Sequence, residues 1–148
     1  MAFIDELKDE VLYDTWREFY HERGMAVRFR LPLVGTEFFA RHLKDPSDTE
    51  EIIALFKTEK LAEDVKTTED EFQINEEVHK CIFKPICDKI KQETEPVCCP
   101  LVNVLMKAID LKTGFTPEAL PIAMEGDVCK IGLGKMGNDD VVEAKGVF

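Results

Sequence analysis

Hydrophobic residues recur at three- and four-residue steps along the first part of the chain, the pattern of helices that bury one face. We expect three helices here: 3–23, 36–44 and 48–59. Gly24 is suited to end the first of them. Ser47 and Glu50 have the spacing of a capping box at the start of the third. Between the first two, residues 25–34 alternate in part and predict a short strand or an extended link.

The hydrophobic period changes after residue 60. In EFQINEEVHK (71–80) apolar residues share one parity with polar residues between them, which predicts a half-buried strand, paired with another near 62–67. A second hairpin is expected around the Glu-Gly-Asp turn at 125–127. Two helices are expected among the strands: 85–94 and 98–112. This order predicts an α+β fold, a small antiparallel β-sheet packed with helices and preceded by a helical segment.

Length and composition agree with one globular domain. The chain has 148 residues, 45% hydrophobic and 33% charged, enough to bury a core without disulfide bonds. We divide the single domain into a helical lead segment (1–60), a core (61–136) and a tail (137–148). The formal net charge of −11 and the scattered basic residues argue against direct binding of nucleic acid.

The chain lacks an apolar run of membrane-spanning length, and its acidic N-terminus does not have the pattern of a signal peptide. We therefore expect a soluble, cytoplasmic protein with no membrane partner. Thiols stay reduced in that compartment. Clustered cysteines there are interpreted first as metal ligands or redox groups.

The concentrated chemistry of the sequence is its five cysteines: Cys81, Cys87, Cys98, Cys99 and Cys129. They contain no Cys-x-x-Cys pair, the strong sign of structural zinc. Three interpretations stay open. A subset binds a metal, since thiolates suit zinc, cuprous copper and iron–sulfur clusters. Alternatively, Cys98 or Cys99 is a redox-active thiol at a helix N-terminus, resolved by a second cysteine. In the third, the cysteines are small core residues.

Neighbouring helical residues point about 100° apart, so at most one of Cys98 and Cys99 is expected to share a centre with Cys129. Cys99, next to Pro100, is slightly favoured.

His79 is a further candidate, because strand parity puts it on one face with Cys81 and Phe83 if the strand continues. The simpler interpretation is an exposed histidine at a strand end. Adjacent acids such as Glu76-Glu77 are interpreted as residues of solvated faces without a catalytic role.

Three segments share an order of elements with a known family: EFQINEEVHKCIF (71–83), EPVCCPLVNVLMKAIDLKTGF (95–115) and EGDVCKIGL (125–133). A Cys that opens an apolar helix ending at Gly, followed by a hairpin with Gly-Asp and then Cys, resembles the 4-vinyl reductase domain family over roughly 60–135. The resemblance implies a small antiparallel sheet packed with helices, often a homodimer. It also implies binding of a small apolar ligand or sensing of redox state, with reductase activity the weaker implication.

Metal-binding members of that family usually carry Glu-x-x-Cys shortly before the last Cys, whereas Glu118 here is followed by Ala-Leu-Pro. The family's zinc site is therefore not transferred whole. The resemblance rests on Cys99 and Cys129 and favours zinc or an iron–sulfur cluster held by cysteines. The supplementary candidates are Cys81 and Cys87, then Cys98, which is expected to face elsewhere, with His79 and Glu118 as possible additions.

Together these features predict a cytoplasmic small-molecule- or redox-sensing domain with a cysteine-ligated metal site and no assigned catalytic residue. One alternative is a cysteine- or iron–sulfur-dependent redox enzyme of tetrapyrrole or cofactor metabolism. Another is a dimeric interaction module with structural cysteines, in which the apolar stripe of 3–23 forms the dimer face.

Overall fold

The structure, a computed structural model, describes residues 2–21, 31–92, 99–115, 117–120 and 122–135. Its helices are α1 (Phe3–His21), the 3-10 helix η1 (Leu31–Leu33), α3 (Thr36–Arg41), α4 (Thr49–Thr58), α5 (Lys84–Lys91) and α6 (Pro100–Thr113). Its strands are β1 (Asp64–Glu69), β2 (Gln73–His79), β3 (Glu118–Ala119), β4 (Ala123–Glu125) and β5 (Val128–Gly134). The expected α+β fold is confirmed.

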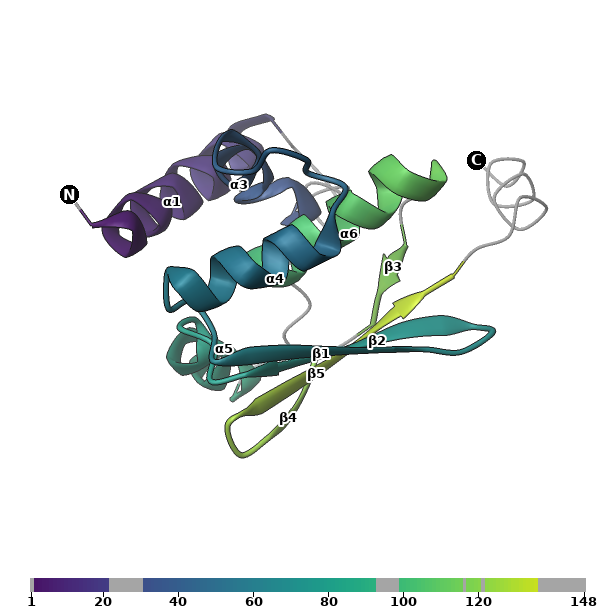
Figure 1. Cartoon of the computed structure of the whole chain (residues 1–148). Helices are drawn as coiled ribbons and strands as arrows, with labels where there is room; N and C mark the ends of the chain where they lie inside the picture. The colour runs from purple at the N-terminus through teal and green to yellow at the C-terminus, as the bar shows by residue number, and fades with distance from the viewer. Residues whose placement is uncertain (1, 22–30, 93–98, 116, 121, 136–148) are drawn as a thin grey trace.

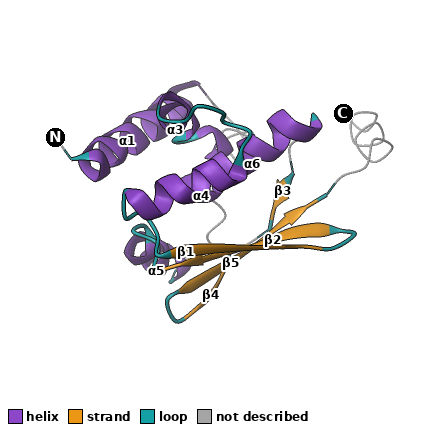
Figure 2. Cartoon of the chain, viewed as in Figure 1, coloured by secondary structure: helices purple, strands orange, loops and turns teal. Residues whose placement is uncertain are grey.

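The strands form one antiparallel sheet in the order β1-β2-β5-β3, and β4 also pairs with β5. Figure 1 shows α1, α3, α4 and α6 on one side of this sheet and α5 at one end of it. Figure 2 shows the same division between a helical layer and a strand layer. The sheet therefore has one face covered by helices and one open face.

The helices follow the sequence pattern closely, with two differences. Asp48, not Ser47, caps α4, and its carboxylate accepts hydrogen bonds from the backbone N–H groups of Glu50 and Glu51. The capping-box prediction was wrong because the Ser47 hydroxyl instead donates to Asp45. The predicted strand or link at 25–34 lies largely outside the described residues, and its last part is the 3-10 helix η1.

Helix α6 is the central element of the core. It is buried on nearly every side, as its continuous apolar sequence predicts: Pro100, Leu101, Val102, Asn103, Val104, Leu105, Met106 and Ala108 are buried. Its polar exception, Asn103, donates from Nδ2 to the carbonyl of Val34 at 3.0 Å, so the buried amide is satisfied. Gly114 ends the helix in a left-handed conformation, φ 81°.

The helical lead segment joins the same core as the sheet. Leu7 of α1, Phe39 of α3 and Phe56 of α4 belong to one hydrophobic cluster with Leu133 of β5. The apolar stripe of α1 is divided, because Leu7 is buried whereas Leu12 and Tyr13 are exposed, and the side chain of Trp16 lies outside the described part. The dimer face stays a prediction. Among the helices that the structure describes, none has the length and apolar character needed to cross a membrane.

Glu76 corrects the sequence analysis, which placed Glu76-Glu77 on a solvated face. Glu76 pairs across the sheet with Thr67 and Ile131 and points to the covered face, where it is only 2% exposed. The Thr67 hydroxyl donates to its Oε2 at 2.7 Å. Burial raises the pKa of Glu76, and the hydrogen bond opposes that rise.

We expect Glu76→Gln to stabilise the chain by about 1–2 kcal/mol at pH 7. Because its folded pKa lies above the ordinary 4.5, the folded chain binds the proton of Glu76 more tightly than the unfolded chain. The stability that this proton contributes is present below pH 4.5 and is lost as the pH rises through the folded pKa. Glutamine stays neutral and can still accept from Thr67, so urea unfolding should show the difference near neutral pH and none in acid.

Glu77→Gln is the matched control on the same strand. Glu77 faces the open side, where its Oε1 lies 3.8 Å from Lys130 Nζ. Exposed pairs of this kind contribute little, so this variant should stay within about 0.5 kcal/mol of the wild type at both pH values. An equal gain in the two variants would mean that net charge, not burial of Glu76, sets the effect.

Candidate functional site

Cys81 reaches the core because the chain turns sharply at the end of β2. Lys80 has a left-handed backbone, φ 53°, which is uncommon for a residue with a side chain. Its N–H donates to the carbonyl of Asp127 at 2.9 Å, and the N–H of Ile82 donates to the carbonyl of Leu61 at 3.0 Å. These bonds fix both sides of Cys81, which is 6% exposed.

This turn corrects the predicted placement of His79. The strand ends there, so His79, Cys81 and Phe83 do not share a face. Val78 pairs with Cys129 and faces the helices, which puts the next residue, His79, on the opposite face of the sheet. Its Nε2 is buried and has no hydrogen-bond partner among the described residues.

Cys99 is the N-cap residue of α6, with an extended backbone (φ −143°, ψ 124°) and Pro100 at the first helical position. Its carbonyl accepts the first helical hydrogen bond, from the N–H of Asn103 at 2.8 Å. Its sulfur does not make a true cap hydrogen bond. The N–H groups of Leu101 and Val102 nevertheless act on it through their partial positive charge.

Cys81 and Cys99 form a pair of neighbouring thiols. Each thiol acts on the pKa of the other, and Cys81 Sγ accepts from the N–H of Phe83 at 3.4 Å. The Cys81 thiol lowers the pKa of Cys99, helped by the Leu101 and Val102 amides and opposed by burial. The Cys99 side chain, with burial, raises the pKa of Cys81. Cys99 is therefore the more acidic thiol of the pair.

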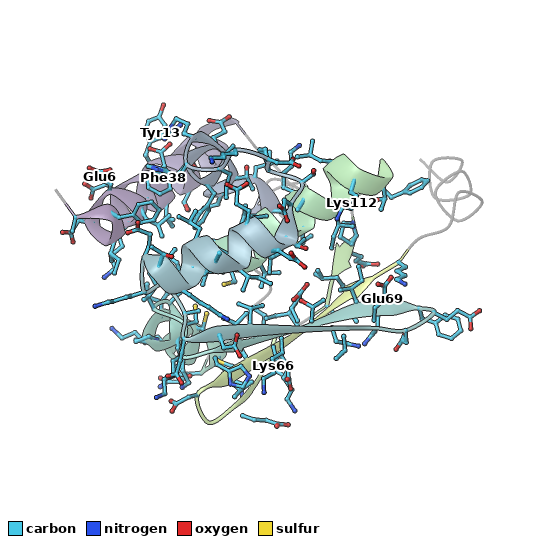
Figure 3. The ribbon with its side chains drawn as sticks, viewed as in Figure 1. Glu6, Tyr13, Phe38, Lys66, Glu69 and Lys112 are labelled. Atoms are coloured by element: carbon cyan, nitrogen blue, oxygen red, sulfur yellow. The ribbon has the colours of Figure 1, made fainter. Side chains whose placement is uncertain are left out.

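Cys129 completes a group of three thiols, here called the thiol cluster (Cys81, Cys99 and Cys129). It lies on β5 opposite Val78 and Met124, on the covered face, and is 5% exposed. Burial, followed by the negative charge of Cys99, raises its pKa. Figure 3 shows sulfur atoms, in yellow, at the end of the sheet where α5 lies. Cys129 is therefore a less acidic neighbour of the pair.

The structure brings together three of the predicted site residues and separates others. Cys87 is buried on α5, and Cys98 lies outside the described residues. Glu118 is exposed on β3 and pairs with Gly134, at the far end of β5 from Cys129. At the rise of a strand, that is roughly 16 Å away. Glu118 therefore does not join the thiol cluster.

The described residues do not fit the expected metal centre. Within them, no group of three or more His, Cys, Asp or Glu side chains is placed to hold a metal ion. Structural zinc takes four ligands, and a Cys-ligated iron–sulfur cluster takes thiolates. The metal site stays a prediction from the sequence.

Two surface hollows lie in the described part of the chain. One, of about 150 Å³, lies between α3 and α6 and is mainly apolar. It is smaller than the roughly 300–1,000 Å³ of usual small-molecule sites. The other, of about 330 Å³, is bordered by lysines, of which Lys57 pairs with Asp64 and Lys80 with Glu63. Neither hollow is the apolar ligand pocket that the resemblance implies.

Sequence reasoning missed the buried position of Glu76, although the alternation Ile74, Glu76, Val78 held the information. It also missed that Lys84 of α5 lies close enough to Cys129 to lower its pKa, against the larger effect of burial. That contact joins segments distant in the sequence, and the sequence has no local sign of it.

Comparison with known proteins adds no assignment. No protein-family model, curated protein or solved structure matches the chain. The resemblance to the 4-vinyl reductase family therefore stays a prediction, and the function is argued from the geometry of the thiol cluster.

Proposed function

We propose that this chain is a redox-sensing domain in which Cys81 and Cys99 pass reversibly between two thiols and a disulfide. The observation that carries the proposal is that Cys81, at the turn after β2, and Cys99, the N-cap residue of α6, are buried in the same hydrophobic cluster, where each shifts the pKa of the other. This places an acidic thiol beside a second thiol that can resolve its oxidised form. This deepens one of the interpretations that the cysteine pattern left open, the redox-active thiol.

The two cysteines have different roles in the proposal. Cys99 is the reactive sulfur, since the Cys81 thiol and the α6 amides favour its thiolate, and the thiolate is the nucleophile. Cys81 is the resolving sulfur, because it faces Cys99 and keeps its proton until Cys99 is oxidised. Cys129 stays protonated beside them.

Burial favours a sensor over an enzyme. Cys81 and Cys99 are each 6% exposed and belong to the hydrophobic core, so a bulky substrate has little access to either sulfur. Oxidation would instead act on the protein itself by tying the segment after β2 to the start of α6. The proposal includes the cytoplasmic location expected from the sequence, where the resting state of such a pair is reduced and its oxidation is the signal.

Peptide mapping after treatment with a thiol oxidant tests the proposal. A freshly reduced chain treated with diamide should yield a Cys81–Cys99 disulfide that dithiothreitol reverses. Cys81→Ala and Cys99→Ala should each abolish this cross-link, and Cys87→Ala, the matched control, should retain it. Absence of any disulfide in the folded chain would reject the redox role. A stoichiometric metal ion in anaerobically purified protein would favour the metal-binding alternative.

A further inference from the structure

We infer that the oxidant detected by the Cys81–Cys99 pair is a small neutral peroxide, of the size of hydrogen peroxide, and not a glutathione or peptide disulfide. This inference rests on the proposed function and names the chemical class that the same site admits.

The enclosure of the thiol cluster supports a small peroxide, and not a bulky disulfide, as the oxidant. Its three cysteines are 5–6% exposed, and the neighbouring Phe83 and Leu101 are buried as well. Thiol–disulfide exchange passes through a mixed disulfide, so half of the attacking disulfide would have to stay bonded to Cys99 inside the core. A molecule close to water in size needs only a small opening of the packing.

The charges at the site suit reaction with a peroxide. The amides of Leu101 and Val102 stabilise negative charge on Cys99. The thiol of Cys81 lies beside the same sulfur and keeps its own proton until Cys99 is oxidised. Cys81 is the thiol with the largest effect on the pKa of Cys99, whereas Cys129 is related to Cys99 only through charge, so Cys81 is the resolving partner.

The reaction balances without another reactant. The Cys99 thiolate attacks one peroxide oxygen, the O–O bond breaks, and the leaving hydroxide takes from solvent the proton that Cys99 released on ionisation, forming water. Cys99 is then a sulfenic acid. The Cys81 sulfur attacks the Cys99 sulfur, the S–O bond breaks, and the hydroxyl group leaves as a second water. The two thiols lose two electrons and two protons, and the peroxide is reduced to two waters.

Competing oxidants test the inference on the full chain. Reduced protein is mixed with hydrogen peroxide or with glutathione disulfide, quenched by alkylation at intervals, and analysed by mass spectrometry. The same rates are measured in urea, which removes enclosure and gives the intrinsic reactivity of the sulfurs. The ratio of the peroxide rate to the glutathione disulfide rate should be about tenfold or more higher in the folded chain. Cys87→Ala should show the same ratio as the wild type.

Two further results would support the assignment of roles. In Cys81→Ala, peroxide should leave a sulfenic acid on Cys99 that dimedone traps, since the resolving thiol is missing. In Cys99→Ala, the peroxide rate of the folded chain should fall about tenfold or more, because the thiolate is lost.

The results distinguish a failure of the inferred oxidant from a failure of the proposed sensing role. An unchanged rate ratio, or a glutathione adduct on Cys99 of the folded chain, would overturn the choice of oxidant and leave the sensing role intact. A disulfide with diamide but none with peroxide would do the same. No disulfide with any oxidant would reject the sensing role itself, and a Cys98–Cys99 disulfide would replace Cys81 as the resolving residue.

Discussion

Oxidation to the Cys81–Cys99 disulfide should raise the free energy of unfolding of the chain by about 3 kcal/mol. The cross-link restricts the unfolded chain between the two residues, and closing a loop of this length removes roughly that much conformational freedom. In the folded chain the two thiols are already neighbours in the core, so little rearrangement of the backbone is expected. The gain is therefore expected to appear nearly in full.

Urea unfolding of oxidised and reduced samples measures this difference. Cys81→Ala exposed to the same oxidant is the control and should show no gain, and Cys87→Ala should gain as much as the wild type. A change in the slope of the transition would also be expected, because the cross-linked unfolded chain exposes less surface. An oxidised protein less stable than the reduced one would mean that the disulfide strains the fold.

The sign of this change decides how the sensor would report. The loop between Cys81 and Cys99 contains the whole of α5, which carries Ile86 exposed on its surface. A stabilising disulfide ties both ends of this loop to the core and restricts α5. A straining one would loosen the start of α6. The stability measurement therefore separates an output through a fixed α5 from an output through local unfolding.

Most of the helices could be predicted from the sequence because helix signals are local. Pro100 and Gly114 mark the two ends of α6, and the 3.6-residue period between them needs no knowledge of distant residues. Strand β3 was missed because Glu118–Ala119 is only two residues long and is defined by its pairing with β5. Such pairing is a tertiary property.

In the candidate site, too, the sequence predicts the features that have local signals and misses those that depend on tertiary contacts. Cys99 was slightly favoured because it precedes Pro100, and the structure makes it the N-cap residue of α6. Strand parity would put His79 and Cys81 on one face only if the strand continued, and the left-handed backbone of Lys80 ends it. That conformation depends on the hydrogen bond to Asp127, far along the chain. The nearness of Cys81 and Cys99 likewise depends on tertiary contacts, so the local sequence pattern does not predict it.

Leu105→Ala should lower the free energy of unfolding by about 3 kcal/mol, within the 2–5 kcal/mol usual for such truncations. Leu105 is fully buried in the middle of α6 and belongs to the one core cluster that joins helices and sheet. Leu111→Ala on the same helix is the matched control, since Leu111 is 51% exposed. Its cost should stay within about 1 kcal/mol, and helix propensity changes equally in both variants.

The same pair of variants tests why the thiol cluster selects its oxidant. Cys99 is held at the first turn of α6, so weaker packing of that helix should open the cluster more often. Leu105→Ala should then react faster with glutathione disulfide than the wild type does, whereas Leu111→Ala should not. If Leu105→Ala unfolds more easily and yet excludes glutathione disulfide equally well, the selectivity does not come from the packing of α6. The burial of Cys99 would then no longer explain the preference for a small peroxide.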